Sequence, residues 1–450
     1  MQRNDNKQLF YKTVFALVIP MALQNLINVG VTSTDVIMLG KVGEKALSGA
    51  SLGGQVNYIM TLIFFGLTSG AAVLTAQYWG KRDLESIATV FSIALKFAIC
   101  VSLCFTVAAF CFPSQIMSIF SNDQDVIKEG VSYLRIVCFS YLFISITMVY
   151  LNIMRSVEQV LVSTVIYFIS LLANIILNAI FIFGMFGLPA MGVRGAAIAT
   201  VMARILECIL VLIYNQKINQ TIPFRLSYFK RKNPLLLKDF FLFSVPVILN
   251  ELVWGAGTSA NTAILGHLGS SVTAANSVAQ VTRQLATVIC FGISSAAAIM
   301  LGKTIGEHKE ELALEYSKRF VKLSVILGLG GAIIVLIVRP IAIANLSLTS
   351  QAKDYLSMMM YVMSYFVIAQ SFNTTMIVGI FRSGGDTRFG LILDTTTMWL
   401  CSILIGYLAA FVFHADVTII YMILLSDEII KIPLSLYRYR SKIWLRNVTR

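Results

Sequence analysis

Charge is what this sequence has least of. Only 13% of its 450 residues are Asp, Glu, Lys or Arg, whereas 57% are apolar. Soluble chains carry charge on roughly a quarter of their residues, so this chain cannot cover its own surface in water. Its solvent is therefore mainly lipid, and an ordinary soluble protein is excluded.

Histidine and clustered cysteine are scarce as well. The three histidines stand singly near predicted loops, which argues against a histidine metal site. The seven cysteines fall in apolar stretches without a CxxC spacing, and we interpret them as small buried apolar residues. The sequence has no HExxH motif and no His/Cys cluster. We therefore predict a protein that is not an enzyme and that holds no cofactor.

Long apolar stretches take the place of charge. Runs such as Phe97–Ile119 and Val160–Pro189 exceed the roughly 20 residues that a helix needs to cross the hydrocarbon core. They are continuous, whereas barrel strands alternate over about 10 residues, so a membrane barrel is excluded. We predict an all-α integral membrane protein with twelve transmembrane helices, at roughly 11–39, 48–79, 88–113, 127–153, 160–186, 194–216, 238–265, 273–304, 316–343, 353–381, 388–413 and 417–437.

The distribution of the positive charges predicts the orientation of these helices. The net charge of +13 does not indicate nucleic acid, because most of the 35 Lys and Arg residues lie at the termini and in the even-numbered loops. Positive residues stay on the cytoplasmic side, so both termini are predicted to be cytoplasmic in a multi-pass protein of the plasma (inner) membrane. The basic N-terminus leads into the first helix, which we expect to be retained.

The chain repeats itself at a constant offset. Pro20 aligns with Pro246 and Gly80 with Gly306, in both cases 226 residues apart (246 − 20 = 226). Six predicted spans separate the copies, so both copies insert with the same orientation, as a parallel repeat with a cleft between two six-helix lobes. The predicted parts are an N-lobe at 1–215 (helices 1–6), a cytoplasmic linker at 216–238, and a C-lobe at 239–450 (helices 7–12 and a basic tail).

Polar residues inside the first lobe form a candidate cation site. Ionisable groups are costly inside a membrane, and Asp35 has no Lys or Arg within one turn to neutralise it. Such an acid can bind and release a proton. Together with Asn174 and Asn178 on helix 5 and Thr200 on helix 6, it could instead supply hard oxygen ligands for a small cation. Asp35 ends a polar stripe about 80° wide on helix 1, formed by Asn25, Asn28, Thr32 and Asp35.

The second lobe has an equivalent stripe with its acid at the other end. Glu251 also lacks a Lys or Arg within one turn, and we predict a functional, unpaired second-lobe acid there. The stripe on helix 7 consists of Glu251, Trp254, Thr258 and Asn261. For the neutral members of both stripes two interpretations stay open, namely a substrate-facing surface or hydrogen bonds between neighbouring helices.

Other charged groups in the spans are weaker candidates. Asp394 is a further acid, and Arg283 could contact substrate. Arg204 and Glu207, three residues apart on helix 6, are expected to pair with each other or to line a wet surface. The turn Arg382–Arg388 is interpreted as a cytoplasmic elbow clamped by Arg–Asp pairing.

The chain resembles the multidrug and toxic-compound extrusion (MATE) family from about Pro20 to its C-terminus. The resemblance implies a V-shaped pair of six-helix lobes that alternates between outward- and inward-facing states. An inward gradient of H⁺ or Na⁺ would drive efflux of organic cations and aromatic drugs. The motifs that carry the resemblance are Asp35–Gly40 followed by Gly43, Asn174–Asn178, Gly192–Thr200 and Phe381–Arg388.

The resemblance also implies roles for single residues. The cation-coupling site of the family maps onto Asp35, Asn174, Asn178 and Thr200, with Na⁺ at Asp35 as the only metal to consider, and Pro20 matches the proline at which helix 1 bends on protonation. The chain departs from the pattern at Asn178, where some relatives have Asp. The helix-7 and helix-10 acids of another branch fall at Trp254 and Ser371 here, so a second-lobe cation site stays an open question. H⁺ and Na⁺ both remain possible, with the single carboxylate favouring H⁺.

Three other functions compete with export. A flippase for lipid-linked oligosaccharides of the same superfamily would need a large cationic cleft, whereas few basic residues lie in the predicted spans. An intramembrane enzyme lacks its motifs, and a channel lacks an evident re-entrant filter segment. The expected partners are the lipid bilayer and small organic cations, without nucleic acid, and we expect a monomer.

Overall fold

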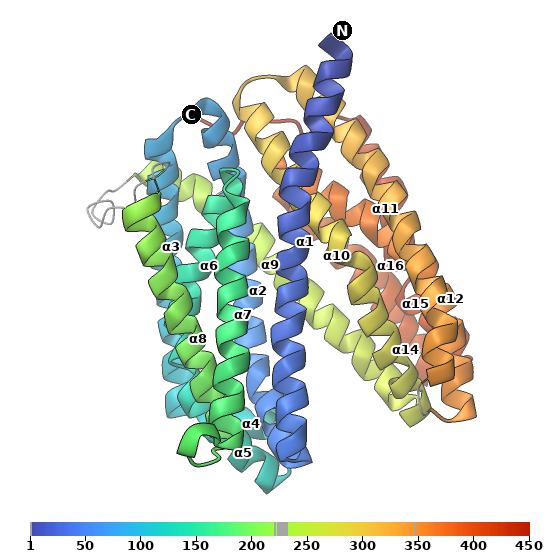
Figure 1. Cartoon of the computed structure of the whole chain (residues 1–450). Coiled ribbons are helices and arrows are strands. Elements are labelled where there is room, and N and C mark those ends of the chain that lie inside the picture. Colours follow the sequence, from blue (N-terminus) through green and yellow to red (C-terminus); the bar gives the residue numbers. More distant parts are fainter. Residues whose placement is uncertain (1, 220–221, 223–232, 346–347) are drawn as a thin grey trace. The chain divides into compact units, whose positions relative to one another are not determined.

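The computed structural model describes residues 2–219, 222, 233–345 and 348–450, with all side chains except those of residues 2–7 and 32. Every regular element in this part of the chain is helical (Figure 1). The predicted all-α class is therefore confirmed. The α-helices are α1 (Gln2–Val42), α2 (Glu44–Lys81), α3 (Leu84–Cys111), α4 (Pro113–Phe120), α5 (Gln124–Val137), α6 (Ser140–Ser156), α7 (Val160–Phe183), α8 (Val193–Ile213), α9 (Pro234–His267), α10 (Ser270–Gly306), α11 (Glu310–Asn345), α12 (Ser350–Thr374), α13 (Thr387–Asp394), α14 (Leu404–Phe411), α15 (Val417–Leu424) and α16 (Asp427–Arg440).

Short segments of other helical types adjoin these helices. A 3₁₀-helix follows α7, and three π-helical segments extend α8, extend α12 and join α13 to α14. Single π turns inside longer helices are frequent at functional sites. The segments are η1 (Met185–Gly187), η2 (Tyr214–Ile218), η4 (Thr375–Phe381) and η5 (Thr395–Ile403).

Each of the twelve predicted transmembrane segments lies on one helix or on consecutive helices. Two of them are interrupted: the predicted helix 127–153 consists of α5 and α6, bent by 55° relative to each other, and the predicted helix 417–437 is divided into α15 and α16. By length and composition, nine helices of the described residues can cross a membrane, or up to ten if α5 and α6 count as one span. The chain is a multi-pass helical membrane protein.

Helix boundaries repeat at the offset seen in the sequence. Adding 226 to the bounds of α2 gives 270–307, and α10 covers 270–306. In the same way the first residue of α3, Leu84, corresponds to Glu310, the first residue of α11. The two halves of the chain therefore begin and end their helices at equivalent residues.

Two compact units make up the chain, and each is described by itself. Unit boundaries do not coincide with the boundaries of the repeat, because short pieces of the first half pack with the second. The N-unit comprises Leu23–Thr75 and Asp83–Ser244, and the C-unit comprises Met1–Ala22, Ala76–Arg82 and Val245–Arg450.

Two equivalent prolines lie where helices pass between the units. α1 leaves the C-unit after Ala22, two residues beyond Pro20, and α9 enters it after Ser244, two residues before Pro246. Proline cannot donate the helical hydrogen bond and weakens a helix locally. Both helices thus have a weak point at the boundary between units.

In the N-unit, close approach of the backbone brings α7 and α8 together. The two helices pack along each other, and α8 also packs against α5 and α6. A side chain on Gly195, in the first turn of α8, would collide with the carbonyl group of Phe181 near the end of α7. The helices that carry the predicted asparagine pair and Thr200 are therefore adjacent.

In the C-unit, the last turns of α2 and α10 cross in a pseudo-symmetric contact. A Cβ atom on Gly80 would collide with the carbonyl oxygen of Lys303, and one on Gly306 would collide with that of Gln77. Gly306 is the repeat equivalent of Gly80 (80 + 226 = 306), and Lys303 is the equivalent of Gln77 (77 + 226 = 303). At this crossing, the glycine of each helix therefore packs against a backbone oxygen of the other helix, and the two contacts are equivalent in the repeat.

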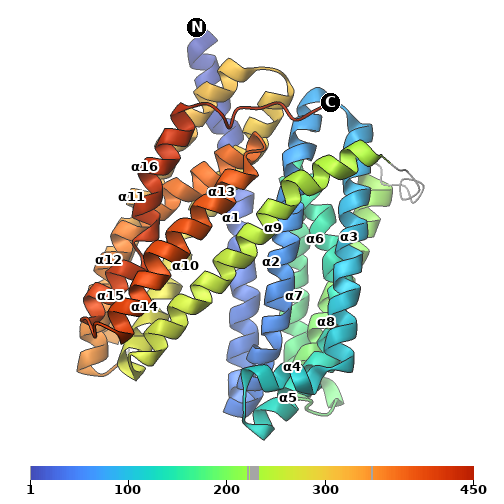
Figure 2. The same cartoon turned by 180° about the vertical axis from the view of Figure 1, so that it is seen from behind.

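The C-terminal tail is packed against this crossing (Figure 2). The side chain of Gln77 donates to the backbone oxygen of Ser383 at 2.7 Å and accepts from the N–H of Val448 at 2.7 Å. The Trp444 side chain is fully buried and stacks on Tyr439. The tail is thus part of the packed C-unit.

Candidate functional site

The N-unit brings three of the four predicted cation-site residues into direct contact. The amide nitrogen of Asn178 donates to Asp35 Oδ1 at 2.5 Å and to Asn174 Oδ1 at 3.1 Å. Both asparagines are buried, and they lie one turn apart on the same face of α7. The carboxyl group of Asp35 on α1 is therefore bound to α7 through the side-chain amide of Asn178.

Thr200 lies at the same place without a direct bond to the acid. It lines a cavity of about 130 Å³ together with Asp35 and Asn174. Its hydroxyl donates to the backbone oxygen of Ala196 at 3.0 Å, one turn earlier on α8. Three of the four predicted residues thus line one cavity, and the fourth, Asn178, is hydrogen-bonded to two of them.

A salt bridge forms the far side of this cavity. Arg204 Nη1 lies 2.6 Å from Glu207 Oε2, as their spacing on the helix predicted. The hydroxyl of Ser170 also donates to Glu207, at 3.0 Å. Arg204 is thus bound directly to Glu207, and it acts on the carboxylate of Asp35 only electrostatically, without an ion pair. Among the described residues no ion pair to Asp35 is found.

Sequence reasoning missed several polar residues of the site. Tyr133 of α5, Tyr167 of α7 and Asn57 of α2 line the same small cavity. The spacing of Tyr167, three and seven residues before Ser170 and Asn174, places it on the asparagine face of α7 and could have identified it. Tyr133 and Asn57 come from other helices and have no such signal in the sequence.

A larger cavity adjoins the site in the N-unit. It measures about 600 Å³, and Asp35, Asn57 and Tyr167 line it as well as the small cavity. Its other walls mix polar side chains with apolar ones such as Leu39 and Met148. Small-molecule sites occupy about 300–1,000 Å³, so an organic compound fits next to Asp35.

Two oxygen acceptors near Asp35 are left without a partner. Asn178 Oδ1 and Asn57 Oδ1 are buried, and neither accepts a hydrogen bond from another described residue. A buried acceptor without a donor is costly, and a water, a cation or a protonated group can satisfy it. The site can therefore hold a proton or a small hard cation at Asp35.

The polar stripe of helix 1 does not act as one surface. Asn28 lines both cavities with Asp35, whereas Asn25 is half-buried and is not among their lining residues. Gln24, which the stripe omitted, is buried and donates to Thr164 at 2.8 Å while accepting from Arg155 at 2.6 Å. The side chain of Thr32 lies outside the described residues.

Glu251 in the C-unit is paired, contrary to prediction. Arg382 Nη2 lies 2.8 Å from Glu251 Oε1, and the two side chains are 5% and 13% exposed. The partner comes from 131 residues away and so escaped a search within one helical turn. The Arg382–Arg388 turn does contain an Arg–Asp pair, but the arginine comes from another helix. Asp386 accepts two hydrogen bonds from Arg438 of α16, at 2.7 and 2.9 Å, and raises the pKa of that guanidinium.

Asp394 is also paired. Its carboxylate lies 2.9 Å from Nζ of Lys431, a buried lysine of α16 that sequence reasoning had counted with the terminal charges. Arg283 lies over the ring of Phe366, 5.8 Å from its centre. Both groups are therefore engaged inside the C-unit.

The neutral residues of the helix-7 stripe make contacts typical of helix packing. The hydroxyl of Thr258 bonds back to Gly255 at 2.9 Å, and the Asn261 amide donates to the backbone of Leu424 at 3.4 Å. Trp254 packs against the buried core of the C-unit. Of the hydrogen bonds, the one from Asn261 joins α9 to α15, whereas the one from Thr258 stays within α9.

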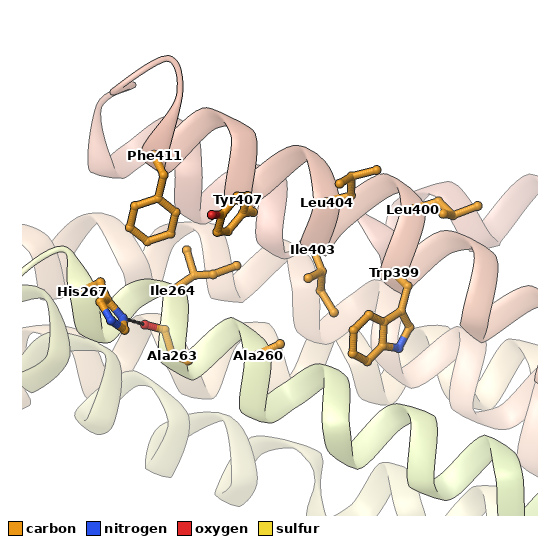
Figure 3. Close-up of a pocket in the computed structure, with 10 residues that line it drawn as sticks. All are labelled: Ala260, Ala263, Ile264, His267, Trp399, Leu400, Ile403, Leu404, Tyr407 and Phe411. Atoms are coloured by element: carbon orange, nitrogen blue, oxygen red, sulfur yellow. Dashed lines mark hydrogen bonds between the residues drawn. The ribbon is translucent and has the colours of Figure 1, made fainter.

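An aromatic pocket of about 670 Å³ lies between α9 and the η5–α14 segment (Figure 3). Trp399, Tyr407 and Phe411 point into it from one side and His267 from the other (Figure 3). The indole N–H of Trp399 donates to the backbone of Val253 at 3.2 Å, which fixes the ring. This pocket is apolar and has no acid among its lining residues.

Family comparison accounts for both halves of the chain. The MatE family model matches it twice, over residues 20–180 and 246–408. The two matches begin at Pro20 and Pro246, at the offset that the sequence repeat gave. Both halves of the chain therefore match the same family model.

Known proteins resemble the chain over most of its length. The probable multidrug resistance protein YoeA of Bacillus subtilis is 22% identical over 404 residues, which cover 88% of this chain and 86% of YoeA. The probable multidrug resistance protein NorM of Agrobacterium fabrum is 23% identical over 407 residues, which cover 89% and 87%. A MOP superfamily transporter from Pyrococcus furiosus shares the fold with a TM-score of 0.87 at 18% identity, over 96% of this chain and 95% of the other. Since the family model covers more than half of its residues, the chain belongs to the MatE family, the multidrug and toxic-compound extrusion (MATE) transporters.

Proposed function

We propose that this transporter exports cationic lipophilic and aromatic compounds from the cell by alternating access, in exchange for H⁺. The observation that carries the proposal is the state of Asp35: it is bonded to Asn178, borders a cavity of about 600 Å³ and has no ion pair among the described residues. The names of YoeA and NorM as probable multidrug resistance proteins support drug export as the activity. The protein works as a monomer in the plasma membrane, with both termini cytoplasmic.

The cavity walls suit such substrates. Tyr58, Tyr133 and Tyr167 line the larger cavity. Aromatic faces attract organic cations, and apolar walls favour lipophilic ones. When Asp35 is ionised it attracts the cation, and when it is protonated that attraction disappears. Protonation and substrate thus compete for one carboxylate.

Protonation can drive transport only if it changes the conformation of the protein. The proton shifts the equilibrium between two conformations only when it binds one of them more tightly than the other. Ionised Asp35 needs water or a cation beside it, whereas neutral Asp35 does not, so α1 can repack against α7. Pro20 lies where α1 passes from one unit to the other and supplies the hinge. Proton binding at Asp35 thus moves α1.

The hydrogen-bond arrangement favours H⁺ over Na⁺ as the coupling ion. Asn178 turns its amide nitrogen toward Asp35, whereas Na⁺ between these residues would need an oxygen there. Of the two carboxylates that line the larger cavity, only Asp35 has no ion pair with a described residue, because Glu207 pairs with Arg204. Little negative charge is left to hold a metal ion.

The same salt bridge argues against the rival function. A flippase for lipid-linked oligosaccharides must neutralise a pyrophosphate. Arg204 is the basic residue that lines the larger cavity, and its charge is balanced by Glu207. The described cavity therefore suits a cation better than a phosphate.

Reconstituted transport tests this function. Purified protein in proteoliposomes is given a fluorescent lipophilic cation and either a pH gradient or a Na⁺ gradient. Uphill movement of the dye under the pH gradient alone is expected. Transport that needs the Na⁺ gradient and fails under a pH gradient would reverse the choice of ion. Dye movement that only follows its own gradient, or flipping of a lipid-linked sugar without dye transport, would contradict the proposal.

A further inference from the structure

A buried lysine of the C-unit is shared by three acids. Lys431 of α16 is 1% exposed, and its Nζ lies 2.9 Å from Asp394, 2.9 Å from Asp427 and 3.2 Å from Glu428. An ammonium group has three N–H bonds, so all of them point at carboxylates. We name these four residues the Lys431 cluster.

The charges in this cluster do not balance. Three carboxylates and one ammonium sum to −2 when all are ionised, and the four side chains are between 2% and 10% exposed. Among the described residues, Glu251 of α9 also faces the cluster, because it interacts electrostatically with Asp394. The charge of Glu251 is cancelled by Arg382, with which it forms an ion pair. Buried charge without a partner is unfavourable, and a carboxylate removes it by binding a proton.

An orphaned acceptor beside the cluster points to the same ligand. Asn373 of α12 is 1% exposed and donates its amide to Glu428 Oε2 at 2.7 Å and to the backbone oxygen of Glu428 at 2.6 Å. Its Oδ1 accepts no hydrogen bond from a described residue. With all three acids ionised the cluster has no O–H to offer this oxygen. A protonated carboxyl supplies that donor.

We propose that the Lys431 cluster is a proton-binding site of the C-unit, distinct from Asp35, in which Asp394, Asp427 and Glu428 together hold at least one exchangeable proton at neutral pH. The ligand is H⁺ alone, because Lys431 fills the position that a metal cation would take. Lys431 ties α13 to α16 through Asp394, so proton uptake on Asp394 weakens this tie. A part for the cluster in driving export rests on the proposed function, whereas the proton site does not.

Infrared titration of the full-length protein in lipid nanodiscs tests the site without any substrate. The Asp35→Asn variant serves as the background, so that the N-unit acid contributes no signal. We expect a carbonyl band of a protonated carboxyl group at neutral pH that persists in this background. Adding Glu428→Gln, Asp394→Asn or Asp427→Asn removes one negative charge, so each should abolish the intensity of one carboxyl group.

The matched control is Glu207→Gln, a neutral replacement of a buried acid of the N-unit that already has its own cation, Arg204. It should leave the band in place. The proposal is overturned if the Asp35→Asn protein shows no protonated carboxyl at neutral pH. It is also overturned if the band survives all three cluster substitutions, or if it disappears with Glu207→Gln alone. Failure of drug transport leaves this measurement unaffected, so the two proposals are tested separately.

Discussion

Replacing Gly80 or Gly306 by Ala puts a methyl group where the backbone of the other helix already lies. A Cβ on Gly306 would be 2.7 Å from the carbonyl carbon of Gln77 and 2.8 Å from its Cα, and one on Gly80 would be 2.9 Å from the carbonyl carbon of Lys303. Backbone atoms cannot rotate away as side chains do, so α2 and α10 must separate.

The size of the effect follows from two opposing terms. Overpacking a tight contact destabilises a protein by about 1–3 kcal/mol. We expect about 2–3 kcal/mol at these two sites, because the methyl group collides with backbone atoms that cannot move aside. Replacing Gly by Ala stabilises the helix itself by about 1 kcal/mol, because Ala has the higher helix propensity. Each substitution should therefore lower the free energy of unfolding by about 1–2 kcal/mol. Because both glycines belong to one crossing, the double variant should lose less than the sum.

Thermal unfolding of the purified variants, followed by intrinsic fluorescence in detergent, is the assay. Gly54→Ala is the control on the same helix, since a Cβ there meets nothing within 4 Å and should leave the midpoint unchanged or raise it. If Gly80→Ala and Gly306→Ala melt with the parent chain or with Gly54→Ala, the two helices do not cross as described.

Three further predictions concern the C-unit. Arg382→Gln should leave the Glu251 carboxylate buried and unpaired and cost about 3–5 kcal/mol, whereas Arg382→Gln combined with Glu251→Gln should recover much of that loss, measured as thermal midpoints. Trp444→Ala should destabilise the C-unit by about 3–5 kcal/mol, because this tail residue is fully buried; an unchanged midpoint would show that the tail does not dock. The N–H and hydroxyl of Thr418 lower the pKa of Asp416, which caps α15. The cap therefore stabilises the protein above the ordinary aspartate pKa of about 4 and loses its effect as the pH falls below it, a dependence that Asp416→Ala should abolish in melts over that range.

Local periodicity was enough for the features that lie along one helix. The repeat of 226 residues seen in the sequence recurs in the helix boundaries, as the bounds of α2 and α10 show. Helical periodicity also placed Asn174 and Asn178 on one face of α7, and in the structure Asn178 donates a hydrogen bond to Asp35. The expectation that Arg204 pairs with Glu207 followed from the same rule and agrees with the structure.

Contacts between distant segments were beyond such reasoning. Glu251 looked unpaired because its partner Arg382 is 131 residues away in the sequence. Lys431 was counted with the terminal positive charges, since nothing near it in the sequence shows that α16 buries it beside Asp394. The break between α5 and α6 and the division of α15 from α16 were also missed, because hydropathy alone does not locate a bend.

Proton-driven efflux by the Asp35→Asn variant is the most direct test of the central claim. Asn keeps the size and hydrogen bonding of the acid but has no charge to lose, so the variant mimics the protonated form permanently. Asp354→Asn makes the same change at an exposed position of α12 and is the control. In proteoliposomes with equal amounts of folded protein and a pH gradient without Na⁺, the parent chain and Asp354→Asn should export the dye, and Asp35→Asn should not exceed protein-free liposomes. Export by Asp35→Asn at the rate of the parent chain would show that Asp35 is a packing residue and that the coupling mechanism is wrong.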